Sequence, residues 1–329
     1  MKAVVFDKIG PPLDVLYLAE VPTPQLNDGE VLIRLIAAPI SPGDFLFIEN
    51  LYPEPKKPRF PRQIGGNHGL GVVEQARPDA HIEPGTLVAF SHYNSWAEYA
   101  AVPVEWLMPL PANFSIEKGA QFFNLISAWD LLTQSRVQAG QWLAVTAGYS
   151  AVSIMVTQFA RQRGVNVISI VRRVHDHLDL KTLGATEVID ISKGSQNTSA
   201  RAKEITHNQG VNAIIDSAGG PATGELIRAM AFGGQVIING GMSPERFELH
   251  NFDVLLNGLE IKAHVYRYFF TPPQISDRAV LQQIVDASGR ADFQVPLGGL
   301  HPLEDFKQAI GESMRNPARG KHFFQMQFA

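Results

Sequence analysis

A turn of small residues between two predicted strands carries the clearest chemical signal in this sequence. The apolar run 142–146 leads into the turn, a helical pattern covers 154–162, and a second β-rich run covers 165–171. Small residues let a pyrophosphate approach the backbone, and the following helix offers free N–H groups and a positive dipole end to that anion. We therefore expect one βαβ unit of a dinucleotide-binding fold. Its cofactor contacts would be Gly148, Tyr149, Ser150, Ala151 and Val152.

The glycine fingerprint of this turn is incomplete. Of the pattern G-x-G-x-x-G only Gly148 is present, with Ala151 and Ser153 where further glycines are common. A buried βαβ unit that binds no ligand therefore remains an alternative for this segment.

Two arginines follow the second strand of the unit. In such folds an Asp or Glu at this position accepts a hydrogen bond from the ribose 2′-OH of NAD, whereas arginine suits a 2′-phosphate. Arg172 and Arg173 stand there, and the nearest acid, Asp176, lies beyond them. The sequence thus predicts a nicotinamide cofactor in its phosphorylated form, NADPH.

Further strands and helices alternate up to about residue 266, which indicates a parallel sheet. The strand candidates are 187–190, 213–216, 235–238 and 259–262. Two of them end in glycine-bearing loops, and ligands bind at the carboxyl ends of parallel strands. We therefore add these loop residues to the cofactor candidates: Ala218, Gly219, Gly240, Gly241 and Met242.

Composition narrows the class of protein. The chain has 329 residues, 45% hydrophobic and 18% charged, so two globular domains are expected. A net charge of −4 without a long basic run gives no reason to expect nucleic acid or an anionic membrane as a partner. No apolar run is long enough to span a membrane, and residues 1–6 predict a strand rather than a signal segment, so we expect a cytoplasmic protein. The absence of cysteine excludes disulfides, thiolate metal sites and a cysteine nucleophile.

A proline-rich stretch, 53–61, is expected to form an extended surface loop. It carries Lys56, Lys57 and Arg59. These charges fit either a solvated face or a contact with an anionic substrate tail, and both interpretations stay open.

The whole layout resembles the medium-chain dehydrogenase/reductase superfamily. The segments DGEVLI at 28–33, GGNHGLGVV at 65–73 and VQAGQW at 137–142 are similar to characteristic segments of that superfamily. The resemblance implies an α/β protein with a GroES-like β-rich catalytic domain, 1–118 and 267–329, and a Rossmann domain with a doubly wound parallel sheet, 119–266. It also implies a homodimer that pairs through the last Rossmann strand, 259–266.

Departures from the zinc-dependent members indicate the zinc-free branch. Ser41 and Asn67 occupy the positions of a cysteine and a histidine ligand, and the four-cysteine lobe is missing. Zinc needs three protein ligands, and only His68 and Asp44 are candidates here. We therefore expect no bound zinc. The i, i+2 pair His175 and His177 is interpreted as a solvated helix start.

Within that branch, five of six characteristic segments look closer to 2-enoyl thioester reductases than to quinone reductases. The six segments are 41–44, 51–53, 65–69, 124–128, 149–153 and 171–173. Phe269-Phe270 falls where the enoyl reductases close a Phe-Trp pair over the nicotinamide. The resemblance adds further cofactor candidates: Asn124, Ser127, Phe269, Phe270 and Lys321.

The resemblance also suggests the chemistry. Hydride addition to the β-carbon of an α,β-unsaturated carbonyl creates an enolate, which a hydrogen-bond donor must stabilise when no metal is present. The resemblance places that donor at Tyr52, whose phenol stays protonated at neutral pH. Asn67 is the second catalytic candidate and lines the same cleft with His68. An NADPH:quinone oxidoreductase and a non-catalytic NADPH-binding relative remain alternatives.

Overall fold

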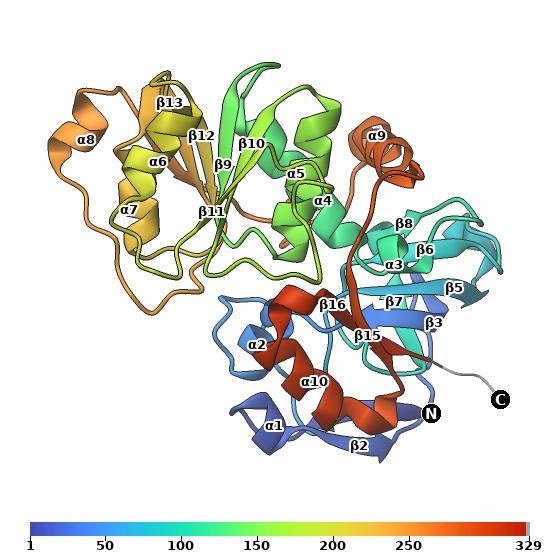
Figure 1. The fold of residues 1–329 in the computed structure, drawn as a ribbon. Helices are drawn as coiled ribbons and strands as arrows, with labels where there is room; N and C mark the ends of the chain where they lie inside the picture. The colour runs from blue at the N-terminus through green and yellow to red at the C-terminus, as the bar shows by residue number, and fades with distance from the viewer. Residues whose placement is uncertain (327–329) are drawn as a thin grey trace. The chain divides into compact units, whose positions relative to one another are not determined.

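The computed structural model describes residues 1–326, which form two compact units (Figure 1). The first unit contains Met1–Leu125, Tyr268–Arg290 and Val295 onward, and the second contains Ile126–Arg267 and Ala291–Gln294. The sequence placed the divisions after residues 118 and 266. The structure divides the chain after 125 and 267 and assigns the short segment 291–294 to the second unit.

The second unit is built on a six-stranded parallel sheet. Its order is β11-β10-β9-β12-β13-β14, with strands β9 (Trp142–Val145), β10 (Asn166–Val171), β11 (Glu187–Asp190), β12 (Val211–Asp216), β13 (Met230–Ile238) and β14 (Glu260–Ala263). Numbered from β9, this is the order 3-2-1-4-5-6 of a Rossmann sheet, as expected. From β9 the successive strands are added toward one edge of the sheet, and from β12 they are added toward the other edge. Ligands of such sheets bind at the carboxyl ends of the strands beside this switch point.

Strands β9, β10 and β12 of this sheet are almost continuously buried because helices cover them. Helix α5 packs on β10, and α7 packs on β12 and β13. The helices are α4 (Phe122–Ser135), which crosses the boundary between the units, α5 (Ala151–Gln162), α6 (Thr198–Ile205), α7 (Pro221–Ile227) and α8 (Asn251–Leu255).

The first unit is β-rich and mostly antiparallel. A seven-stranded sheet has the order β15-β16-β3-β5-β6-β8, with β7 also pairing β3, and a small sheet has the order β2-β1-β4. The strands are β1 (Lys2–Phe6), β2 (Tyr17–Glu20), β3 (Glu30–Pro39), β4 (Gln63–Ile64), β5 (Gly69–Gln75), β6 (Leu87–Phe90), β7 (Tyr99–Pro103), β8 (Leu107–Pro109), β15 (Leu297–His301) and β16 (Lys321–Gln325). The β15–β16 pair is parallel, joined by helix α10, and β16 pairs antiparallel with β3.

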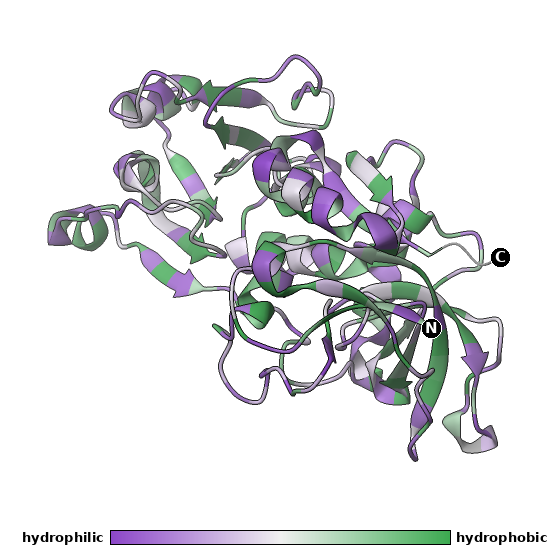
Figure 2. Ribbon diagram, turned by 90° about the horizontal axis from the view of Figure 1, so that it is seen from below, coloured by the Kyte–Doolittle hydropathy of each residue, from purple (hydrophilic) through white to green (hydrophobic). Residues whose placement is uncertain are grey.

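Short helices complete the first unit. They are α1 (Pro12–Val15), α2 (Pro42–Ile48), α3 (Ile116–Gly119), α9 (Arg278–Gly289) and α10 (Phe306–Arg315). Five 3₁₀ turns cover Pro78–Ala80, Val104–Trp106, Ile275–Asp277, Leu303–Asp305 and Pro317–Arg319. In α10 the buried residues Phe306, Ala309 and Ile310 recur at helical spacing, and Figure 2 shows hydrophilic and hydrophobic residues alternating along the helices.

Most predicted elements occur with shifted ends. The helix expected at 154–162 starts at Ala151, because Ser150 caps it by accepting a hydrogen bond from Ser153 N. The strand expected at 235–238 extends back to Met230. By contrast, β11 covers the four residues expected for it, Glu187–Asp190.

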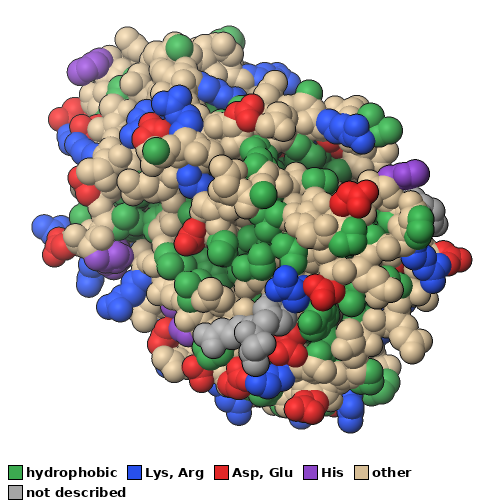
Figure 3. All heavy atoms as spheres, turned by 90° about the vertical axis from the view of Figure 1, so that its right-hand side faces the viewer, with side chains coloured by type: hydrophobic (Ala, Val, Ile, Leu, Met, Phe, Trp, Pro, Cys, Tyr) green, Lys and Arg blue, Asp and Glu red, His purple; other side chains and the backbone are tan. Residues whose placement is uncertain are grey.

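The surface carries charges of both signs. On the face shown in Figure 3, Lys and Arg side chains are interspersed with Asp and Glu. None of the helices within residues 1–326 combines the length and the apolar character that crossing a bilayer requires.

Candidate active site

A buried carboxylate organises the polar cluster of the first unit. Asp44 is the third residue of helix α2, and its Oδ2 accepts a hydrogen bond from Ser41 N at 2.8 Å, which closes a capping box. Its Oδ1 accepts from both N and Nδ2 of Asn67, each at 3.0 Å. The segment before β5 is thereby tied to the start of α2. Burial raises the pKa of Asp44 to about 6, although these hydrogen bonds lower it.

A lysine provides the counter-charge of this carboxylate. Lys321 begins β16, and the pairing of β16 with β3 brings it beside the residues that follow β3. Its Nζ donates to Ile40 O at 3.2 Å and to Ser41 Oγ at 3.3 Å. Burial lowers the pKa of Lys321 to about 8, while the Asp44 carboxylate raises it. At neutral pH both groups are therefore mainly ionised, and their opposite charges attract each other.

Tyr52 lies beside this pair as a protonated donor. A Cβ added to Gly43 would lie 2.6 Å from the Tyr52 hydroxyl oxygen, so the glycine leaves the space that the phenol occupies. The ring packs edge-on against Phe269 with 5.1 Å between centroids. Burial, and then the charge of Asp44, raise the pKa of Tyr52 well above its ordinary value. The hydroxyl therefore keeps its proton throughout the neutral range.

Lys56 lies against aromatic rings near Tyr52, and the sequence left open whether it faces solvent or an anionic substrate tail. Its Nζ lies 4.5 Å from the centroid of the Phe269 ring and 5.6 Å from that of Tyr93. Burial lowers the pKa of Lys56 to about 8, and Asp44 opposes the shift. Lys57, by contrast, bonds the backbone, with its Nζ 3.3 Å from Asn50 O. The sequence feature that could have identified Lys56 is its position in the proline-rich loop, four residues after Tyr52.

Two neutral histidines belong to the same unit. His68 Nδ1 and Ser91 Oγ are hydrogen-bonded at 3.1 Å, and the imidazole stacks on Phe123 with 3.8 Å between centroids. Burial, together with the charges of Lys56 and Lys321, holds the pKa of His68 well below its usual value. Burial likewise lowers the pKa of His92 to about 4. Both rings are therefore uncharged at neutral pH.

In the second unit, hydroxyl groups shape the predicted phosphate turn. Ser150 Oγ accepts from Ser153 N at 3.2 Å and bonds Ser153 Oγ at 2.9 Å. Ser153 Oγ in turn donates to Thr146 O at 2.9 Å, so the serine fits where a glycine is common. A Cβ on Gly148 would lie 2.9 Å from Val171 Cγ1, so this residue needs to be glycine for the turn to pack on β10. Ala151 and Val152 open helix α5.

The loop that carries the two arginines is held by other residues. The buried Tyr149 accepts from His175 N at 2.9 Å through its hydroxyl group. Asp190, at the end of β11, accepts from Val174 N at 2.8 Å. Hydrogen bonds, first from the Ser192 hydroxyl, lower the pKa of Asp190 to about 2, so it stays ionised. Arg172 and Arg173 are exposed on this ordered loop, where a phosphate can reach them.

The glycine-bearing loops after β12 and β13 pack together. Thr146 Oγ1 donates to Asp216 Oδ1 at 2.6 Å and accepts from Ser217 N at 2.9 Å, which joins the carboxyl ends of β9 and β12. Asp216 Oδ1 also accepts from Gly219 N at 3.0 Å. Ser243 N donates to Ala218 O at 2.8 Å, so the loop with Gly240, Gly241 and Met242 lies against the loop with Ala218 and Gly219. Sequence reasoning missed Thr146 and Asp216.

The predicted cofactor residues are therefore divided between the units. Asn124, Phe269, Phe270 and Lys321 belong to the first unit, and Ser127 and the other candidates belong to the second. Asn124 is buried, with its Nδ2 3.3 Å from Gln121 Oε1, and Phe270 is half exposed beside Phe269. Ser127 lies half-buried in α4. The ammonium of Lys321 is already bonded to Ile40 and Ser41 within the first unit.

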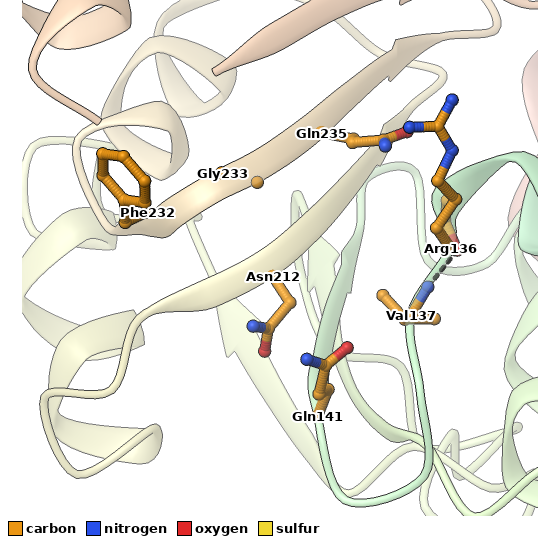
Figure 4. A pocket seen from close by; sticks show the side chains of 9 residues that line it. Arg136, Val137, Gln141, Asn212, Phe232, Gly233 and Gln235 are labelled. Carbon is orange, nitrogen blue, oxygen red and sulfur yellow. Dashed lines mark hydrogen bonds between the residues drawn. The ribbon is translucent and has the colours of Figure 1, made fainter. Parts of the chain in front are cut away.

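A separate pocket lies at the opposite end of the Rossmann sheet (Figure 4). Its volume is about 290 Å³, and it is lined by residues near the amino ends of β9 and β12 and by the β13 segment beside them. The lining residues are Ser135, Arg136, Val137, Gln141, Asn212, Phe232, Gly233, Gly234 and Gln235. None of the sequence-predicted site residues is among them.

Comparison with known proteins agrees with this architecture. A family model described as "Alcohol dehydrogenase GroES-like domain" matches residues 27–112, and one described as "Zinc-binding dehydrogenase" matches residues 151–281. The chain belongs to the medium-chain dehydrogenase/reductase superfamily. The expected fold class, a GroES-like domain with a Rossmann sheet, is confirmed.

Individual relatives are distant but cover nearly the whole chain. The mitochondrial enoyl-[acyl-carrier-protein] reductase of Xenopus tropicalis is 26% identical over 95% of this chain and 91% of its own length. A mycobacterial quinone oxidoreductase has a TM-score of 0.80 at 23% identity, covering 99% of this chain and 100% of that one. The Etr1p complex with NADP and crotonyl-CoA has a TM-score of 0.83 at 24% identity, covering 99% of both chains.

The residues at the family's catalytic-zinc position do not fit a metal ion in this structure. Asn67 donates its side-chain amide to Asp44, and Ser41 Oγ lies 3.3 Å from the Lys321 ammonium. A fixed cation thus stands beside the position, and the Asp44 oxygens are already occupied by N–H donors. The site lacks the three free N, S or O ligands that zinc requires.

The Asp44–Lys321 pair makes the stability of the protein depend on pH. A carboxyl group whose pKa is higher in the native than in the unfolded state binds its proton more tightly in the native state. Asp44 is therefore mostly neutral below its native pKa of about 6 and needs a counter-charge only above it. We expect Lys321→Met to lower the free energy of unfolding by about 3 kcal/mol near pH 7, where Asp44 and Lys321 are both mainly ionised, and by only about 1 kcal/mol near pH 5.

Urea unfolding of both proteins at the two pH values measures this difference. The control is Lys8→Met, which removes an exposed lysine of the same unit and should leave both values unchanged. An equal loss at both pH values would show that Lys321 does not compensate the Asp44 charge.

Proposed function

We propose that this protein catalyses the NADPH-dependent reduction of an activated carbon–carbon double bond, as in an enone or a 2-enoyl thioester. One observation carries the proposal: Tyr52 is held as a protonated donor by burial and by the nearby Asp44 carboxylate. The names of the enoyl reductase relatives support it. The coarser conclusion, an oxidoreductase of this superfamily, rests on the family matches themselves.

The residues of the first unit suit the carbonyl end of such a substrate. NADPH, when bound, supplies the hydride. The Tyr52 hydroxyl donates a hydrogen bond to the substrate carbonyl and stabilises the enolate that forms there. Lys56, whose pKa of about 8 leaves it mainly charged at neutral pH, adds positive potential beside Phe269. Asn67 acts indirectly, because its side-chain amide donates a hydrogen bond that orients the Asp44 carboxylate and stabilises its charge.

The residues of the second unit suit the cofactor. Ser150 and Gly148 leave the start of α5 open for a pyrophosphate, whose charge the helix N-terminus stabilises. Arg172 and Arg173 are the proposed contacts of the 2′-phosphate. The N-terminus of α5, the two arginines and the close packing at Gly148 thus fit a phosphorylated dinucleotide.

Reduction of a quinone is the second candidate. A mycobacterial quinone oxidoreductase shares the fold, and Phe269, Phe270 and Tyr93 provide aromatic surface in the first unit for a flat ring. A non-catalytic NADPH-binding role predicts cofactor binding without turnover of any acceptor. Assays with crotonyl thioesters, simple enones and naphthoquinones separate the three functions.

Replacing the proposed donor tests the mechanism. We expect Tyr52→Phe to lower kcat on the best double-bond substrate on the order of 100-fold, because the enolate loses one hydrogen bond in a water-poor site. NADPH oxidation measures the rate. Tyr17→Phe, which removes an exposed hydroxyl bonded to Asp7, should retain full turnover. Full turnover of Tyr52→Phe would exclude Tyr52 as the donor.

Cofactor preference tests the role of the arginines. We expect tighter binding of NADPH than of NADH, and Arg172→Ala and Arg173→Ala should each weaken NADPH binding about tenfold without affecting NADH. Fluorescence titration gives the dissociation constants. Arg201→Ala, on the exposed face of α6, is the matched control. Equal affinities of the native protein for both cofactors would contradict the assignment.

We also propose that catalysis needs no metal ion. We expect kcat of the protein to be unchanged after dialysis against excess chelator, because the polar cluster around Asp44 provides cationic and O–H donors in place of a Lewis acid. The assay compares chelated protein with and without added zinc. A loss of activity that zinc restores would refute this proposal.

Finally, we propose a homodimer that pairs through the β14 edge. Within residues 1–326, β14 pairs with β13 alone, and Ile261 and Val265 are exposed there. The Lys262 ammonium bonds Gln235 Oε1 at 2.9 Å, so its charge does not block the edge. Continuation of the sheet across a two-fold axis would cover this apolar surface.

Sedimentation equilibrium tests the dimer. We expect twice the chain mass of 36.1 kDa at micromolar concentration, and Val265→Asp should shift the protein to monomer because it places a charge in the apolar interface. The control Ile275→Asp, at an exposed apolar residue of the other unit, should leave the protein a dimer. A native protein that is monomeric under these conditions would rule out the proposal.

A further inference from the structure

Two histidines and a glutamate gather under helix α10, on a part of the first unit that the proposed reaction does not use. His301 ends β15, His322 is the second residue of β16, and Glu312 lies in α10, which packs on both strands. Because strand neighbours point to opposite faces, His322 turns toward α10 while Lys321 turns toward Asp44. The group is therefore separate from the polar cluster around Asp44.

The two imidazole rings are within hydrogen-bond distance of each other, and the distances within the group also suit a shared cation. His301 Nε2 lies 3.0 Å from His322 Nδ1, and Glu312 Oε2 lies 3.8 and 3.9 Å from those two nitrogens. The carboxylate oxygen is too distant to accept a hydrogen bond from either ring. Yet a circle through the three atoms has a radius of about 2.1 Å, which is the length of a Zn–N or Zn–O bond.

The surroundings are built to hold the three ligand atoms in this arrangement. A Cβ on Gly299 would lie 2.7 Å from His301 Nε2 and 3.1 Å from His322 Nδ1, so the glycine keeps the space between strand and helix open. Gln308 Nε2 donates to Glu312 Oε1 at 3.0 Å, which leaves Oε2 facing the histidines. Outer contacts of this kind orient the carboxylates of metal sites. The His322 side chain is only 3% exposed.

We propose that His301, Glu312 and His322 bind one divalent transition-metal ion, with zinc as the best match. Two imidazole nitrogens and a carboxylate oxygen are a ligand set that zinc accepts, and water can complete the coordination. The ion ties α10 to both strands of its βαβ unit. This proposal departs from the expectation of a chain without zinc, which was based on the cleft positions and on the absence of cysteine.

Metal titration of the full chain tests this site. Protein dialysed against chelator is titrated with zinc chloride by calorimetry, and its melting temperature is measured with and without zinc. We expect one ion per chain and a rise in melting temperature of about 4 °C at zinc concentrations about 100-fold above the dissociation constant. Cobalt(II), used as a visible probe, should give an absorption band that zinc abolishes.

Variants assign the ion to these residues. Glu312→Gln keeps the shape of the side chain and should weaken zinc binding at least about 100-fold, as should His301→Ala. His207→Asn removes an exposed histidine of the other unit, keeps a residue that tolerates its positive φ, and should bind zinc normally. Circular dichroism verifies that each variant is folded.

Three outcomes would overturn the proposal: no saturable binding by the native chain, unchanged affinity in Glu312→Gln, or an equal loss in His207→Asn. Turnover of Glu312→Gln separates this site from the proposed reaction, because the variant should lose the ion and retain kcat. A loss of turnover that accompanies the loss of zinc binding would leave the metal site standing and would link it to the reaction.

Discussion

The buried carboxylate of Asp44 is the constraint around which the first unit is arranged. It accepts three hydrogen bonds from Ser41 and Asn67, and it stands opposite the Lys321 ammonium. These contacts join the start of α2, the segment before β5 and the first residue of β16, which are remote in sequence. An ionised carboxylate without these partners would be costly at 1% exposure. The donor at Tyr52 is kept protonated partly by the same charge.

In the second unit, the buried hydroxyl group of Thr146 plays a similar connecting role. The Thr146 hydroxyl donates to Asp216 and accepts from the backbone after β12, so it links the carboxyl ends of the two strands where the chain order reverses. Sheets of this type bind ligands at that point. These hydrogen bonds, together with that of Ser243 N to Ala218 O, hold the glycine-bearing loops beside the phosphate turn.

Strand β16 shows how one short element can serve two purposes. Alternation along the strand sends Lys321 to the Asp44 cluster and His322 to the space under α10. A change of register by one residue would exchange these side chains. The pairing of Phe323 with Pro39 on one side and of Leu300 with Phe323 on the other therefore determines which residues face the polar cluster and which face the proposed metal site.

The sequence by itself was sufficient for the order of the main elements, the Rossmann unit and the superfamily. Apolar runs and glycine turns are local patterns, and the phosphate turn with Gly148 and the arginine pair after β10 can be read from them. It was not sufficient for Asp216, for the partial burial of Lys56 or for the cluster of His301, Glu312 and His322. Those properties depend on contacts between distant segments, and burial and shared charge determine how such side chains behave. Only the tertiary structure brings the partners within bonding distance, because strand register and helix packing, not spacing along the chain, set the distances between them.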